Sequence, residues 1–322
     1  MRVLVFGASL ENNGGMRLAW PAKTPADTGH DKTTVGFVRG TAAPDFICIG
    51  AQKAGTSWLY QQLEAHPDFW MPPVKELHYF NELSRVKRTD PPRCRDERDR
   101  WFLEELTSLR SKPYLDLEGY ARLFEAKGKL ICGDITPAYS MLSDEIIQEI
   151  SGRFPRLKVI FLARDPVERT WSQLSMGVRL RMIKPFDATD ADEVIRNVLR
   201  PGVLLRSYPS KIAARWHRGV PSDLFRVYFF DDLKENPLEM RRQILSFLGG
   251  DPDKCDARIN ASRNTDSEKK KLRLSEQVRS SLARFFKKEL ESCARELGGR
   301  ARDWPARYGF SLLALFVCVA NT

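Results

Sequence analysis

A lysine lies inside a short glycine-bounded turn, at a point where the chain passes from an apolar run to a segment with helical periodicity. The apolar run 46–49 predicts a buried strand, and the turn that follows extends from Gly50 to Gly55. Residues 56–65 have leucines four apart, which predicts a helix. A helix that begins after such a turn presents unpaired N–H groups, and glycines let an anion approach the backbone. This pattern indicates a phosphate-binding loop with Lys53 as its cation; the alternative is an ordinary helix-opening turn with an incidental lysine.

The loop differs from those that bind nucleoside triphosphates. A Walker A loop has lysine and then serine or threonine after its second glycine, whereas Thr56 and Ser57 stand there in this chain. A triphosphate needs that lysine on its β and γ phosphates, so a lysine at position 53 suits a transferred group that lies one phosphate from the ribose. The stretch resembles the 5'-phosphosulfate loop of sulfotransferases that use 3'-phosphoadenosine 5'-phosphosulfate (PAPS). In that family a Lys-x-Gly-Thr-Ser/Thr-Trp run follows the first strand, and residues 53–58 match it.

Residues 71–80 (MPPVKELHYF) carry a candidate base. Two prolines exclude a helix at the start of this segment, and an extended backbone would place Glu76 and His78 on one side and Leu77 on the other. Glycan sulfotransferases of the heparan type have a similar Lys-Glu-x-x-Phe-Phe run whose glutamate acts as the base. The resemblance therefore implies Glu76 as the base, with His78 as the alternate. The alternatives are a surface carboxylate paired with Lys75 and a packed imidazole.

A third set of candidate residues, Arg164 and Ser172, follows the apolar run 158–163. Asp165 and Pro166 have the residue types of an N-cap and a first helical position, so a helix should begin there. Arg164 and Ser172 match the family's 3'-phosphate pair, which the resemblance implies holds the phosphate that distinguishes PAPS from ordinary adenine nucleotides. Arginine suits this role because its donors form a bidentate fork. The alternative is a capping arginine and an unrelated serine on a helix surface.

The resemblance thus implies a full set of site residues. Lys53, Glu76 and His78 would be catalytic, with Lys53 neutralising charge on the leaving 5'-phosphate. The backbone amides of residues 55–57 would hold that phosphate, and Trp58 would lie on the adenine side. The donor-binding residues are Lys53, Ala54, Gly55, Thr56, Ser57, Trp58, Arg164 and Ser172. PAPS is the implied co-substrate, and no metal is implied.

Four apolar runs alternate with helical patterns along the chain. They are residues 46–49, 129–133, 158–163 and 224–230. This alternation predicts an α/β fold: a P-loop NTPase-like parallel sheet with helices on both faces. Asp134 follows the second run and is expected to cap the next turn or to contact the acceptor. Further helices are expected over residues 204–217, 237–248 and 274–297.

We expect three parts in the chain: a flexible N-terminal arm over residues 1–43, a sulfotransferase domain over 44–305, and a short apolar tail over 306–322. The tail is too short for an ordinary membrane span, and packing on the core, membrane contact and association all stay open for it. The basic run 258–271 occupies the place of a late family loop that closes on the nucleotide, and a solvated charge run is the alternative.

The composition is basic, with 52 Lys and Arg against 42 Asp and Glu in 322 residues and a net charge of +10. This balance favours anionic ligands without choosing among nucleotides, nucleic acids, glycans and membrane surfaces. The six cysteines show no CxxC pair and no metal-site spacing, as expected in a reducing compartment. Because the N-terminus makes a poor signal peptide, we expect a cytoplasmic protein.

The predicted function is transfer of a sulfuryl group from PAPS to a hydroxyl or amine. A glycan is the first candidate for the acceptor, and a small molecule or lipid is the second. One alternative is a P-loop kinase or NTPase, which the missing Gly-Lys-Ser/Thr disfavours. The other is a non-catalytic nucleic-acid-binding protein, but the chain lacks aromatic-basic interleaving and zinc spacing, so we expect no nucleic-acid partner.

Overall fold

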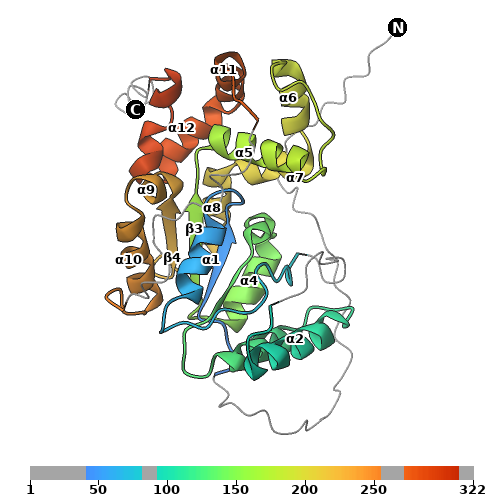
Figure 1. The fold of residues 1–322 in the computed structure, drawn as a ribbon. Coiled ribbons are helices and arrows are strands. Elements are labelled where there is room, and N and C mark those ends of the chain that lie inside the picture. Colours follow the sequence, from blue (N-terminus) through green and yellow to red (C-terminus); the bar gives the residue numbers. More distant parts are fainter. Residues whose placement is uncertain (1–40, 82–92, 255–271, 312–322) are drawn as a thin grey trace.

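The structure is a computed structural model that describes residues 41–81, 93–254 and 272–311 (Figure 1). Within these ranges four parallel strands form one sheet, in the spatial order β2-β1-β3-β4. The strands are β1 (Phe46–Gly50), β2 (Gly133–Ile135), β3 (Lys158–Ala163) and β4 (Phe225–Phe229). The chain leaves β1 toward β2 on one side and later crosses to β3 on the other. The carboxyl ends of β1 and β3 therefore form the switch point at which open α/β sheets bind ligands.

Twelve α-helices surround this sheet in the described part of the chain (Figure 1). They are α1 (Thr56–Glu64), α2 (Glu97–Arg110), α3 (Leu117–Leu123), α4 (Asp144–Arg153), α5 (Pro166–Arg179), α6 (Ala191–Val198), α7 (Pro201–Leu204), α8 (Pro209–Gly219), α9 (Phe230–Glu235), α10 (Pro237–Leu248), α11 (Glu276–Phe285) and α12 (Lys287–Glu296). The short 3₁₀ segments are η1 (Phe124–Lys127), η2 (Pro137–Met141), η3 (Leu205–Ser207), η4 (Gly299–Asp303) and η5 (Ala306–Tyr308). The predicted α/β fold with a parallel sheet is confirmed.

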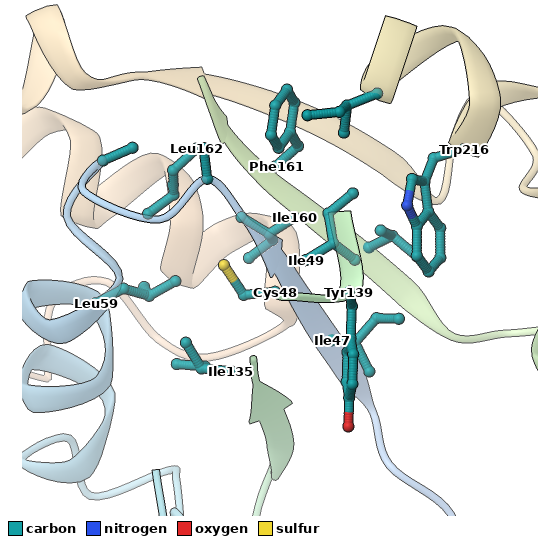
Figure 2. Close-up of a cluster of buried hydrophobic side chains, with 14 of the residues drawn as sticks. Ile47, Cys48, Ile49, Leu59, Ile135, Tyr139, Ile160, Phe161, Leu162 and Trp216 are labelled. Carbon is teal, nitrogen blue, oxygen red and sulfur yellow. The ribbon is translucent and has the colours of Figure 1, made fainter. Parts of the chain in front are cut away.

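The central strands are apolar throughout because both of their faces are covered. All five residues of β1 are buried, as are five of the six in β3. Figure 2 shows side chains of both strands in one cluster, to which α1 contributes Leu59 and β2 contributes Ile135. This rigid core fixes the strand ends from which the loops of the site emerge.

The second strand begins later than predicted. Residues 129–133 were expected to form it, but the regular ladder covers Gly133–Ile135. Ile131 makes only an isolated bridge, to Phe69. Close pairing with β1 begins at Gly133 because a Cβ there would lie 2.3 Å from the carbonyl oxygen of Phe46.

Two helices predicted as continuous are interrupted. In the segment 204–217, α8 starts afresh at Pro209, because the residue before a proline is disfavoured in helical conformation. In the segment 274–297, α11 and α12 are separated at Phe286, whose ring is buried against Tyr208. Tertiary packing on one aromatic ring thus overrides the helical pattern of the sequence.

The end of the described chain packs against the strand ends. The hydroxyl of Tyr308 donates to Asp165 at 2.9 Å, while Arg307 and Trp304 both donate to Asp231. Both carboxylates are buried, and burial raises the pKa of Asp165 to about 6. The domain boundary expected after residue 305 stays a prediction.

Several sequence-based expectations concern residues that are not described. The N-terminal arm up to residue 40, the basic run 258–271 and the apolar tail from 312 onward lie outside the described residues. None of the helices in the described ranges has the length and hydropathy that a bilayer crossing requires.

Candidate functional site

The turn between β1 and α1 has the conformation expected of an anion-binding loop. Lys53 and Gly55 both adopt left-handed backbone, with φ of 72° and 97°. A Cβ at Gly55 would lie 2.5 Å from Leu233, so a side chain does not fit there without a shift. Glycine lets the loop turn directly into α1 and leaves no side chain to cap that helix. The first turn of α1 therefore offers its N–H groups to an anion.

The other predicted residues of this loop differ in exposure. Ala54 and Thr56 are buried, and Ser57 is exposed. Trp58 is only 5% exposed and belongs to the hydrophobic core. Its contact with adenine stays a prediction.

Arg164 lies directly after β3 and reaches back to the lysine loop. Its Nη1 donates to the carbonyl oxygen of Lys53 at 2.6 Å, and its guanidinium lies 4.2 Å from the ring centre of Phe230. Its Nε is buried and has no hydrogen-bond partner among the described residues. Burial lowers the pKa of this guanidinium below its ordinary value. A buried donor of this kind indicates a place for a further acceptor, as a phosphate oxygen would be.

A carboxylate lies beside this arginine. Glu168 accepts from Arg164 at 3.2 Å and from Lys234 at 3.1 Å. Burial raises the pKa of Glu168, but the charges of Arg164 and Lys234 outweigh that effect and hold it below its ordinary value. Glu168 is thus ionised at neutral pH and balances two cations at the carboxyl edge of the sheet.

Helix α5 carries the second member of the predicted 3'-phosphate pair. Asp165 caps this helix, because its carboxylate accepts from the N–H groups of Val167 and Glu168. Ser172 lies two turns further along and is half-buried, although Trp171 beside it is buried. The predicted N-cap is confirmed, and the role of Ser172 stays a prediction.

The segment with the candidate base is not extended, so that prediction is wrong. Glu76 and His78 both have left-handed backbone, with φ of 67° and 54°, at a cost of about 1–3 kcal/mol each. Their side chains nevertheless meet as expected, with 3.3 Å between the carboxylate and Nε2 of the imidazole. Lys75 also pairs with Glu76, at 2.7 Å, and the side-chain amide of Asn81 lies 3.2 Å from Nδ1 of His78.

The ion pairs determine the protonation state of Glu76. Its side chain is one-third exposed, at 33%. Partial burial alone would raise its pKa. The contacts with His78 and Lys75 outweigh that effect and lower the pKa to about 2. Glu76 is therefore a carboxylate at neutral pH and can accept a hydrogen bond or a proton.

The base segment is tied to the strand that leads into the lysine loop. The amide of His78 donates to Oγ1 of Thr136 at 3.4 Å, and the amide of Thr136 donates to the carbonyl oxygen of Cys48 at 3.1 Å. Cys48 lies in β1, two residues before the glycine turn. Lys53 and Arg164 thus follow the ends of the adjoining strands β1 and β3, and the segment of Glu76 is bonded to Thr136 at the end of β2.

Asp134 does not cap the turn that follows it, so that expectation is wrong, while its contact with the acceptor stays a prediction. It is 1% exposed and accepts hydrogen bonds from the hydroxyls of Thr136, Tyr139 and Tyr120 at 2.7, 2.6 and 3.2 Å. Burial raises its pKa above the ordinary value, against the opposing effect of these donors. The sequence signal for this cluster was the pair of hydroxyl residues that follows Asp134 within five positions.

Comparisons with known proteins agree with the geometry. The model of the sulfotransferase family matches residues 44–253. The membrane-associated sulfotransferase kil1 of Dictyostelium discoideum is 29% identical over 141 residues, which cover 42% of this chain and 23% of that protein. Carbohydrate sulfotransferase 15 of Mus musculus is 28% identical over 151 residues, covering 40% of this chain and 26% of that protein. The chain therefore spans about a quarter of the length of these curated relatives.

One solved structure supports the fold. The crystal structure of a sulfotransferase from Alicyclobacillus acidocaldarius superposes with a TM-score of 0.56 at 23% identity, covering 84% of this chain and 98% of that one. The family match spans all four described strands of the sheet and includes Lys53, Glu76 and Arg164. The chain belongs to the sulfotransferase family.

Proposed function

We propose that this protein transfers a sulfuryl group from PAPS to an acceptor hydroxyl or amine. The observation that carries the proposal is the hydrogen bond between Arg164 and the carbonyl oxygen of Lys53. It joins the loop proposed for the 5'-phosphosulfate to the residue proposed for the 3'-phosphate. A ligand with phosphate groups at both ends of one adenosine fits such an arrangement.

The residues of the chain fit the donor. The N–H groups of residues 55–57 and the ammonium of Lys53 would hold and neutralise the 5'-phosphate as it leaves. The fork of Arg164 would bind the 3'-phosphate, and its buried Nε is a donor for one of its oxygens. Ser172 is proposed as the second 3'-phosphate ligand and Trp58 as a neighbour of adenine. When bound, PAPS supplies the activated sulfuryl group; the protein aligns the two partners and stabilises charge.

Glu76 is proposed to accept the proton of the acceptor. It is ionised at neutral pH, and its contacts with Lys75 and His78 make it a weak base until the acceptor approaches. We infer that the acceptor hydroxyl displaces one of these contacts, which restores basicity to the carboxylate. His78 is the alternate base and otherwise positions Glu76.

A carbohydrate is the proposed acceptor class. The support is the relative that is named a carbohydrate sulfotransferase, together with the Lys-Glu-x-x motif shared with glycan enzymes. A small molecule remains the second candidate. A cytoplasmic location is proposed on the sequence features alone.

The test combines donor binding with transfer. Calorimetric titration should show much tighter binding of adenosine 3',5'-bisphosphate than of AMP, and equal affinities would refute the 3'-phosphate site. The wild type should then transfer labelled sulfate from PAPS into a carbohydrate pool, both in the presence and in the absence of EDTA. The Lys53→Ala variant should transfer none. Magnesium-dependent ATP turnover without sulfate transfer would instead support the kinase alternative.

A further inference from the structure

Two consecutive backbone amides in the base segment, those of His78 and Tyr79, donate to hydroxyls of one buried cluster. The N–H of His78 donates to Thr136 Oγ1 at 3.4 Å, and the N–H of Tyr79 donates to the Tyr139 hydroxyl at 3.1 Å. These amides belong to the second left-handed residue of the segment and to the residue after it, so the bonds fix a part of the backbone that is unfavourable on its own.

Both hydroxyls are oriented by the same carboxylate. Thr136 donates to Oδ1 of Asp134 at 2.7 Å and Tyr139 donates to Oδ2 at 2.6 Å. Because each hydroxyl proton is committed to Asp134, its lone pairs face the amides of the base segment. One carboxylate thus determines the donor direction of the two hydroxyls that bind the base segment.

Asp134 and the hydroxyl residues that bind it are shielded from water. Asp134 is 1% exposed, and Thr136 and Tyr139 are fully buried. A carboxylate held away from water requires several donors, and three hydroxyls donate to Asp134 here. The network links strand β2 to a segment almost sixty residues earlier in the chain, as the separation of 58 between His78 and Thr136 shows.

We propose that Asp134 is a positioning residue for the base, acting through Thr136 and Tyr139 to hold Glu76 and His78 in their left-handed conformations. Because Asp134 is 1% exposed, we assign it no contact with the donor or the acceptor. Asp134 would influence the reaction only by fixing the orientation of the Glu76 side chain. The proposal rests on the proposed function, in which Glu76 accepts the acceptor's proton.

The chain offers a matched pair of variants. Tyr139→Phe and Tyr120→Phe each remove one phenolic hydroxyl from Asp134, but only the Tyr139 hydroxyl also accepts from the base segment. We expect Tyr139→Phe to lower kcat for sulfate transfer by about 10- to 100-fold, because a small displacement of the base costs rate steeply. Tyr120→Phe should lower kcat much less. The KM for PAPS and the affinity for adenosine 3',5'-bisphosphate should stay unchanged in both. Equal losses in the two variants would overturn the proposal.

A second measurement does not depend on turnover. The imidazole ¹⁵N signals of His78 report its contact with Glu76, and the chain has only 4 histidines, so assignment by substitution is practical. In Asp134→Asn and Thr136→Val these signals should move toward those of Glu76→Gln, and in Tyr120→Phe they should stay near the wild type. Unmoved signals in folded Thr136→Val and Tyr139→Phe would refute the positioning role. If the wild type transfers no sulfate, the proposed function fails, while these spectra still decide whether Asp134 positions Glu76.

Discussion

The guanidinium of Arg164 and the carbonyl oxygen of Lys53 are joined by a hydrogen bond of 2.6 Å across 111 residues of sequence. The bond connects the loop after β1 with the end of β3. A change at either residue should therefore affect both ends of the donor site.

Arg164→Lys should weaken nucleotide binding. Lysine keeps the charge but lacks the planar fork of arginine, so we expect the loss of one charge-assisted hydrogen bond worth about 1.5–3 kcal/mol. We expect the affinity for adenosine 3',5'-bisphosphate to fall about 10- to 100-fold by calorimetry. The exposed Arg218 is paired with Asp144, and Arg218→Lys is the control. An unchanged affinity in Arg164→Lys would remove Arg164 from the site.

Glu168→Gln should have the opposite effect. Glu168 competes with the 3'-phosphate for Arg164 and Lys234 and adds a negative charge beside it. Removing that charge should tighten binding of adenosine 3',5'-bisphosphate about fivefold, or by about 1 kcal/mol, and leave AMP binding unchanged. Weaker binding of both nucleotides would mean instead that Glu168 is needed to orient the arginine.

Gly55→Ala should destabilise the protein. The left-handed φ of 97° and the 2.5 Å approach to Leu233 both oppose a side chain. We expect a loss of about 1–3 kcal/mol in the free energy of unfolding, measured by urea denaturation. Gly152 lies in α4 with nothing within 4 Å of an added Cβ. Gly152→Ala should therefore stabilise the protein by up to about 1 kcal/mol, and a similar result at both positions would contradict the argument.

The acid limb of the pH–rate profile should respond to Lys75. In the folded protein the pKa of Glu76 is lowered from 4.5 to about 2. Its side chain is therefore still a carboxylate at pH 4.5 and becomes protonated only as the pH falls through about 2. In the wild type, kcat/KM should show no decline with a midpoint near 4.5 from this group. Lys75→Met removes a charge that lowers this pKa, so an acid limb should appear at higher pH. An identical profile would show that Glu76 is not the titrating base.

The sequence predicted the elements with the strongest local patterns. β3 has the predicted bounds because a short apolar run rich in β-branched residues favours a strand buried on both faces. The helix start after Arg164 was predicted from Asp165 and Pro166, whose residue types suit an N-cap and a first helical position.

The conformation around Glu76 was not predictable in the same way. The amides of this segment donate to Thr136 and Tyr139, which lie far along the chain. A local pattern of residue types contains no information on such contacts. For the same reason Asp134 was interpreted as a cap or an acceptor ligand rather than as the centre of a buried network.

The contacts of Tyr308 with Asp165 and of Arg307 with Asp231 have a practical consequence for the choice of expression boundaries. A fragment cut at residue 253, where the family match ends, would leave the buried carboxylates of Asp165 and Asp231 without the donors at residues 304–308. One of these acids caps the helix that starts beside Arg164. The smallest autonomous unit of this protein should therefore include the 3₁₀ turn η5, through residue 308.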